Sequence, residues 1–182
     1  MNWPNRLSLI RIGSVPVLTL LLVLDRLIWT RYAALFLFIL SAITDFVDGH
    51  LARKYNLVTN FGKFIDPVAD KLLVLSTMVM LSWHGVLPAW IVVIVLFREL
   101  AVDGLRLVAV EQGRVIAAGK LGKIKTVVQM VLIIAHLVYF AQFPLLHILA
   151  GWLLIPSRIA MIAMTIWSGA DYFVRNKEVL HG

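Results

Sequence analysis

The sequence contains no cysteine among its 182 residues, which excludes disulfide scaffolds, thiolate metal centres and cysteine nucleophiles. Acidic residues are scarce as well, with 10 Asp+Glu against 17 Lys+Arg and a formal net charge of +7. What the chain has is apolar surface, because 61% of its residues are hydrophobic. A soluble fold of about 150 residues buries only about 70% of the surface that its unfolded chain exposes. The composition therefore excludes an ordinary soluble enzyme and a disordered chain, and it predicts an integral membrane protein.

Six segments are long and apolar enough for the roughly 20-residue helix that spans a bilayer. They are residues 7–24, 32–43 with a helical continuation to 53, 64–83, 89–110, 124–140 and 145–174. The breaks between them are short and hold no linker or repeat. We therefore expect one all-α integral membrane domain over residues 1–182 with six transmembrane helices. We expect no separate cleavable signal, because Pro4 and Pro16 interrupt the first stretch and no small-residue cleavage site follows it.

Lysine and arginine are unevenly distributed among the connections, and this bias sets the expected orientation. The N-terminus, the connections at 53–63 and 112–125, and the C-terminus are basic, whereas the opposite connections carry only Arg26 and Arg31. Both termini are therefore expected on the cytoplasmic side of the cell membrane. The positive charge then faces anionic lipid or an anionic substrate, and no nucleic-acid partner is expected.

Four of the ten acidic residues lie in one stretch at the ends of the second and third apolar segments. Asp45 and Asp48 are three apart and Asp66 and Asp70 four apart, so each pair lies on one helix face. The short connection between the helices makes them antiparallel neighbours. Four carboxylates in one pocket repel, so either some are protonated or hard cations such as Mg²⁺ or Mn²⁺ lie between them. The alternative is four separate surface ion pairs, with Arg53, Lys54, Lys63 and Lys71.

The residues between the carboxylates refine this hypothesis. Gly49 and Ala52 are small and allow a ligand or a neighbouring helix to approach the backbone. Arg53 offers a guanidinium fork to a phosphate. Thr59 and Gly62 lie in or beside the connecting loop.

Residues 45–70 read D-x2-D-G-x2-A-R-x8-G-x3-D-x3-D. Position for position, this resembles the signature of the CDP-alcohol phosphatidyltransferases. The resemblance implies a six-span, usually homodimeric membrane enzyme whose active site opens to the cytoplasm. It also implies that the four aspartates hold two divalent ions, Mg²⁺ or Mn²⁺, and that Asp70 is the base that deprotonates the acceptor alcohol. The CDP part of the donor, CDP-diacylglycerol, would be contacted by Gly49, Ala52, Arg53, Thr59 and Gly62.

Beyond the signature, the chain is similar along nearly its whole length to the bacterial branch that uses sn-glycerol 3-phosphate as acceptor. One position departs, because Asp103 stands where that branch commonly has a small hydroxyl residue. Basic residues after the signature suit a phosphorylated acceptor, and the candidates are Arg106, Lys120, Lys123, Lys125 and Arg158. Arg158 lies inside the sixth apolar segment, where an arginine is expected to face a polar cavity or to pair with Glu99 or Asp103.

Other functions compete with this hypothesis. Within the family the acceptor could be an inositol phosphate, serine or phosphatidylglycerol. A divalent-cation or proton-coupled transporter also uses intramembrane carboxylates, but its site usually lies near the bilayer midplane within repeats, which this sequence lacks. A prenyl-diphosphate enzyme with aspartate-rich motifs does not fit six spans and a single split motif.

Overall fold

A computed structural model describes residues 3–54, 59–114, 116 and 119–180, without the side chains of 3–5, 46–54, 60, 61, 63, 64, 120 and 180. Six α-helices follow one another with no strand among the described residues. They are α1 (Trp3–Val23), α2 (Ile28–Lys54), α3 (Asn60–Trp83), α4 (Ala89–Glu111), α5 (Lys120–Phe140) and α6 (Leu146–Arg175), followed by the short 3-10 helix η1 (Lys177–Leu180). The prediction of an all-helical chain is confirmed, and the acidic stretch after residue 43 continues α2 as expected.

Four of the helices are long and apolar enough to cross a membrane, over Arg6–Val23, Ile28–Asp45, Leu121–Phe140 and Leu146–Arg175. The helices α3 and α4 are of sufficient length, but every 18-residue stretch in either one holds three or more charged residues. Their charges belong to the candidate site described below. The apolar helices and the composition together indicate a multi-pass membrane protein.

Three helices end in the same local structure. A residue just past the helix takes a positive φ, and two backbone N–H groups donate to carbonyl oxygens of the last helical turn. At the end of α3 this residue is Gly85 (φ 70°), and at the end of α4 it is Gly113 (φ 71°). Glycine adopts this conformation without strain. At the end of α5 the position is held by Gln142 (φ 53°), with Gln142 N–H bonded to Tyr139 O at 3.1 Å.

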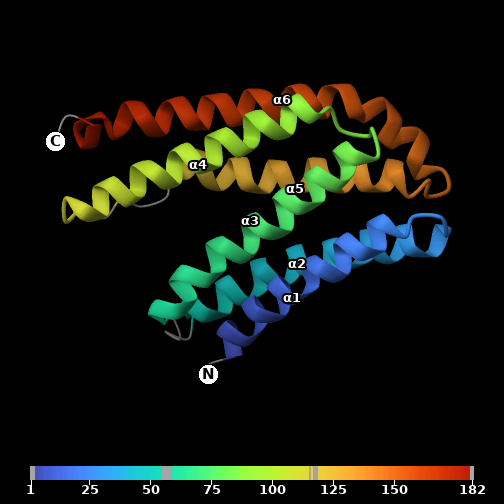
Figure 1. Ribbon diagram of the computed structural model, residues 1–182, viewed down its shortest axis with the longest axis horizontal. Helices are drawn as coiled ribbons and strands as arrows, with labels where there is room; N and C mark the ends of the chain where they lie inside the picture. Colours follow the sequence, from blue (N-terminus) through green and yellow to red (C-terminus); the bar gives the residue numbers. More distant parts are fainter. Residues whose placement is uncertain (1–2, 55–58, 115, 117–118, 181–182) are drawn as a thin grey trace.

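The helices are arranged around α3, which runs obliquely between the α1–α2 pair and the layer that contains α4 and α6 (Figure 1). α1 packs against α2 and α3, α5 packs against α6, and α3 also contacts α4 and α5. The end of α2, the start of α3 and both described termini lie toward the left side of Figure 1. This arrangement brings charged side chains from α2 to α5 to one end of the bundle.

The buried core lies between the helices and consists of aliphatic, aromatic and methionine side chains. Leu18, Leu22, Phe38, Leu73 and Ile133 are almost completely buried there. The outer surface is apolar too, and long stretches of α1, α2 and α6 expose leucine, isoleucine and tryptophan. An apolar exterior is unfavourable in water and favourable in lipid, in agreement with the composition.

Two leucines of α1 provide a matched test of this packing, since Leu22 is fully buried and Leu20 is 56% exposed. Leu22→Ala should destabilise the folded protein by about 2 kcal/mol, the low end of the range for buried leucines. The low end applies because a bundle in lipid loses packing contacts but little of the water-transfer free energy. Unfolding of the purified protein in mixed micelles measures the change. Leu20→Ala should stay close to the wild type, and equal losses in both variants would contradict the described packing of α1.

Candidate active site

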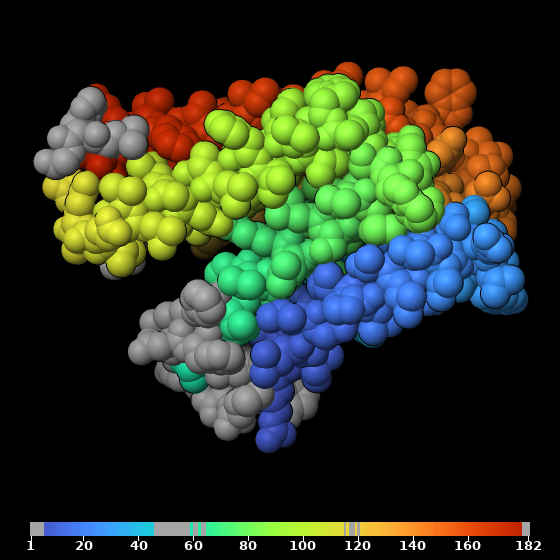
Figure 2. All heavy atoms as spheres, viewed as in Figure 1, coloured from blue at the N-terminus to red at the C-terminus, as the bar shows by residue number. Residues whose placement is uncertain are grey.

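A cavity of about 460 Å³ opens at the end of the bundle where α2 ends and α3 begins. The surface between α3 and α4 is hollowed at this end of the molecule (Figure 2). Carboxylates and cations share its walls, which come from α2 to α6 and the residue before α5. The polar side chains that line it are Asp45, Asp66, Asp70, Lys71, Arg98, Glu99, Arg106, Lys123, Lys125, Thr126, Gln129 and Tyr172.

Three of the four predicted aspartates meet in this cavity: Asp45 from α2, and Asp66 and Asp70 from α3. Asp45 lies close enough to the other two for their charges to repel. Oδ1 of Asp70 is buried and has no hydrogen-bond partner among the described residues. A buried carboxylate oxygen without a donor is costly, so this wall is suited to a cation or to a proton-bearing ligand.

The remaining signature residues lie beside the cavity or outside the described side chains. Thr59 caps the N-terminus of α3, because its hydroxyl accepts the N–H of Gly62 at 2.9 Å. Thr59 therefore ends the connecting loop, and its side chain caps the first turn of α3. The backbone of residues 46–54 is helical. Four predicted site residues lie in this stretch, where only the backbone is described: Asp48, Gly49, Ala52 and Arg53.

Helix α1 supplies two partners of the carboxylates that the sequence did not assign to the site. Ser8 donates its hydroxyl to Asp66, and Arg11 donates to Asp45. Both α1 side chains are buried. Their spacing of three residues puts them on one face of the helix, which was the available signal. Interfacial position explains polar residues at such a helix end equally well, so the sequence did not distinguish the two roles.

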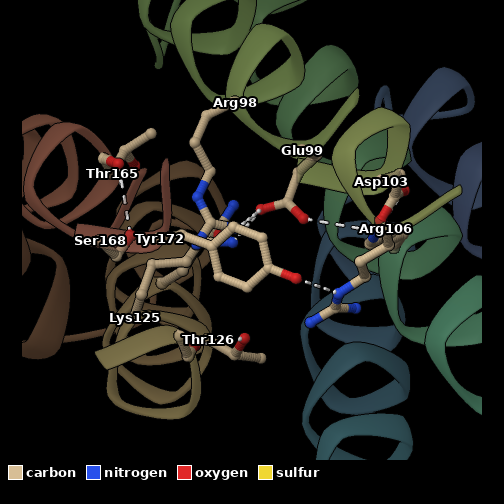
Figure 3. Close-up of polar contacts among 12 residues, drawn as sticks. Arg98, Glu99, Asp103, Arg106, Lys125, Thr126, Thr165, Ser168 and Tyr172 are labelled. Carbon is tan, nitrogen blue, oxygen red and sulfur yellow. Dashed lines mark hydrogen bonds and ion pairs between the residues drawn. The ribbon is translucent and has the colours of Figure 1, made fainter. Parts of the chain in front are cut away.

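In the same cavity, cations gather around one buried carboxylate, Glu99 of α4 (Figure 3). Lys125 of α5 pairs with it directly, Arg98 Nη1 lies 3.3 Å from its Oε1, and Lys71 Nζ lies 3.7 Å from its Oε2. Lys71 also pairs with Asp103. Three cations share two carboxylates here, so this wall keeps a positive charge. Asp103, the position that departs from the related branch, acts as the partner of Lys71.

Arg106 and Tyr172 close another part of the wall. Arg106 Nε donates to the Tyr172 hydroxyl at 3.0 Å, and its guanidinium carbon lies 5.6 Å from the centre of that ring (Figure 3). Tyr172 is packed in a small apolar cluster with Val102 and Leu105 of α4. The guanidinium of Arg106 is thus held by α6 while it lines the cavity. Lys123, another predicted acceptor residue, also lines it.

The structure does not bring every predicted acceptor residue to this cavity. The side chain of Lys120 is outside the described part of the chain. Arg158 is described, and its Nη2 donates to the backbone carbonyl of Val86 at 2.6 Å. Val86 follows the far end of α3. Neither Glu99 nor Asp103 pairs with Arg158, because both are held by cations of α3, α4 and α5.

The residues fit a divalent cation by their chemistry. Three carboxylates converge on one cavity, and one of them has a buried oxygen without a donor. Oxygen ligands are those that Mg²⁺ and Mn²⁺ prefer. Among the side chains that the structure describes, no three acidic or histidine groups are close enough together to enclose an ion. Asp48 is not among those side chains.

The fold and this cavity agree with the sequence comparisons. The chain belongs to the CDP-alcohol phosphatidyltransferase family, whose family model matches residues 1–168. It is therefore a membrane transferase of phospholipid biosynthesis. It is 40% identical to a CDP-diacylglycerol--glycerol-3-phosphate 3-phosphatidyltransferase of Bacillus subtilis (strain 168), over 98% of this chain and 97% of that protein. A probable phosphatidylglycerophosphate synthase of Mycobacterium tuberculosis is 40% identical over 96% of this chain and 81% of its own length. A Rickettsia typhi protein of the same name as the Bacillus relative is 43% identical over 71% of this chain and 72% of its own length.

Proposed function

We propose that this protein transfers the phosphatidyl group of CDP-diacylglycerol to sn-glycerol 3-phosphate, giving phosphatidylglycerophosphate and CMP. The observation that carries the proposal is the division of one cavity into two walls. Asp45, Asp66 and Asp70 form an acidic wall, and the cations around Glu99 form a basic one. The acidic wall suits a metal-bound pyrophosphate, and the basic wall suits an acceptor with its own phosphate. The names of the relatives support the same pair of substrates.

Asp45, Asp48, Asp66 and Asp70 would hold two divalent ions, Mg²⁺ or Mn²⁺. When bound, such ions neutralise the pyrophosphate and stabilise the leaving group of an in-line displacement. Donor contacts are assigned to Gly49, Ala52, Arg53, Thr59 and Gly62. Arg53 would place its fork on a phosphate, and the small residues leave room for the nucleotide.

The basic wall positions the acceptor. Arg106, Lys123 and Lys125 line the cavity and would bind the phosphate of glycerol 3-phosphate, with Lys120 at the start of the same helix. Asp70 would accept the proton of the attacking hydroxyl, since its buried oxygen has no other donor. The new bond forms between that hydroxyl oxygen and the phosphorus of the phosphatidyl group. The bond from this phosphorus to the CMP oxygen breaks, and CMP leaves with the electron pair.

The setting of the reaction is proposed from the sequence. Six apolar segments support six spans, and the Lys/Arg bias supports placing both termini and the active site on the cytoplasmic side of the cell membrane. The apolar faces left exposed by α1, α2 and α6 support contact with bilayer lipid. A homodimer is proposed on the family resemblance.

Asp70→Asn should lower turnover by at least about 100-fold, because the amide keeps the shape of the carboxylate and cannot accept the proton. Release of CMP, with both substrates saturating and Mg²⁺ or Mn²⁺ present, measures the loss. Additional metal should not restore turnover, and donor binding should be affected less than turnover. Asp171→Asn is the matched control, since Asp171 pairs with Arg175 on α6 and does not line the cavity. Near wild-type turnover of Asp70→Asn, or full wild-type activity in excess chelator, would show that the acidic wall has another role.

Arg106→Ala should raise the apparent constant for glycerol 3-phosphate by about 10-fold, since a hydrogen bond to a charged group contributes about 1.5–3 kcal/mol. The donor constant should change little. Arg158→Ala is a control for loss of an arginine, because Arg158 reaches the carbonyl of Val86 and not this cavity. Steady-state kinetics with each substrate varied separates the two halves of the site. Equal use of glycerol or serine in place of glycerol 3-phosphate would refute the phosphorylated acceptor.

A cysteine in place of Ala89, an exposed residue at the end of the connection between α3 and α4, should react with an impermeant thiol reagent applied to intact cells, and one at residue 116 should not. We expect this because the basic residues of the 112–125 connection keep it on the cytoplasmic side, and the connection between α3 and α4 then lies on the opposite side. The chain has no native cysteine, so each variant carries a single reporter. Permeabilised cells provide the control in which residue 116 becomes accessible. The reverse labelling pattern would place the active site on the outer face.

A further inference from the structure

A second cavity of about 490 Å³ lies at the other end of the bundle. Its walls come from the start of α2, the connection after α3, the end of α5 and the start of α6, through Arg31, Val86, Tyr139, Phe140, Gln142 and His147. Thirteen helical residues separate Asp70 from the end of α3 at Trp83, which corresponds to about 20 Å. The reaction proposed above does not use this cavity.

Two side chains in its wall have hydrogen-bonding capacity that the described residues do not satisfy. Arg31 donates Nε to the Asp25 carbonyl at 2.9 Å, but its terminal nitrogens reach only Phe140 O and Asp25 Oδ2, each at 3.5 Å. Contacts of that length are weak hydrogen bonds. Nδ1 of His147 is buried and has no partner among the described residues. Arg31, whose guanidinium carbon also lies 5.0 Å from the centre of the Phe140 ring, can therefore donate to a ligand oxygen in the cavity, and His147 has an unpaired ring nitrogen in the same wall.

Gln142, another polar residue of the wall, has a strained backbone conformation. It takes the positive φ of the helix-ending motif that Gly85 and Gly113 occupy at the ends of α3 and α4. Three residues later, Leu145 has φ 61° and ψ −43°, and Leu146 N–H bonds to Pro144 O at 2.7 Å. That is a strained three-residue turn. Of these two residues only Gln142 lines the cavity, and backbone strain often occurs at ligand-binding positions.

The charge at this end is positive. Arg158 extends into the same region, where Nη2 donates to the carbonyl of Val86 and Nε is buried without a partner. Within the described part of the chain, no carboxylate lies within ion-pair distance of Arg158. Asp25 is the acidic group nearest Arg31, and it is shared with His84 at 3.6 Å. Two arginines against one carboxylate leave a site that favours an anion.

The surface beside the cavity indicates which anion is available there. Trp29, Leu145 and Leu146 are 74%, 80% and 47% exposed, and Tyr139 in the cavity wall is 39% exposed. Large exposed apolar side chains next to a cationic pocket match a molecule with a charged head and acyl chains. An arginine fork and neutral donors are the groups that recognise a phosphate.

We propose that the end of the bundle opposite the carboxylates binds the phosphate group of an anionic phospholipid, through Arg31, Gln142 and His147. The acyl chains of this lipid lie along the exposed residues of α2 and α6. The site holds a lipid as a ligand of the folded protein and takes no part in the transfer reaction.

The test is native mass spectrometry of the purified full-length protein with phosphatidylglycerol or phosphatidylcholine of identical acyl chains. The wild type should retain phosphatidylglycerol in preference to phosphatidylcholine. Arg31→Gln should weaken that retention by about 10-fold, the effect of removing a charge-assisted contact. Arg26→Gln is the matched control, because Arg26 is an exposed arginine of the connection just before α2 and does not line the cavity. CMP release should be unchanged in both variants.

Gln142→Gly keeps the proposal testable if Arg31→Gln folds poorly. Glycine relieves the positive φ, so the midpoint of thermal unfolding should rise while retention of phosphatidylglycerol falls. A purely structural role for Gln142 would move stability and leave lipid retention unchanged, which overturns its assignment. Equal retention of the two lipids, or equal retention by Arg31→Gln and Arg26→Gln, overturns the site. Displacement of phosphatidylglycerol by inorganic phosphate would show that the pocket takes a free phosphate and not a lipid.

Discussion

Ionised side chains inside an apolar bundle must be neutralised by one another or by a ligand, and this constraint organises the structure. At one end, Glu99 gathers Lys71, Arg98 and Lys125 from three helices. In the same cavity, Arg11 reaches Asp45, while Asp70 retains a buried oxygen without a donor among the described residues. The interactions are strong because the surroundings are of low polarity, and the same surroundings make any unmatched charge expensive. The unmatched charges are therefore the places where substrates and cations are expected.

The same constraint explains why the helices are unequal. α1, α2, α5 and α6 contain stretches apolar enough to face lipid, whereas every 18-residue stretch of α3 or α4 holds three or more charged residues. α3 lies between the α1–α2 pair and the layer of α4 and α6, so its charged side chains can face the cavity (Figure 1). The buried leucines of α1 support this placement by packing against α3, and a small residue of α6 makes room for a cation of α4. At Gly169, for example, an added Cβ would lie 3.2 Å from Arg98 Cγ.

The two ends of the bundle use the same chemical groups differently. The carboxylate end combines acidic and basic walls, as a transfer between two phosphorylated substrates requires. The opposite end has arginines, a histidine and an amide with a single nearby carboxylate, and its backbone is strained at Gln142 and Leu145. A cavity lined by arginine, histidine and amide groups with one nearby carboxylate is suited to holding an anion. This contrast separates a site for reaction from a site for lipid binding.

The sequence by itself determined the membrane class, the helices and the acidic motif, because hydropathy, helical spacing and a fixed signature are local properties of the chain. It indicated that Asp45, Asp66 and Asp70 share faces of adjacent helices, and the structure brings them to one cavity. Only the tertiary structure decided the partners across helices. It gave Ser8 and Arg11 to the carboxylates, made Glu99 the centre of the cationic wall, and sent Arg158 to the carbonyl of Val86. Such pairings join residues tens of positions apart, and they depend on helix rotation and tilt, which hydropathy does not encode.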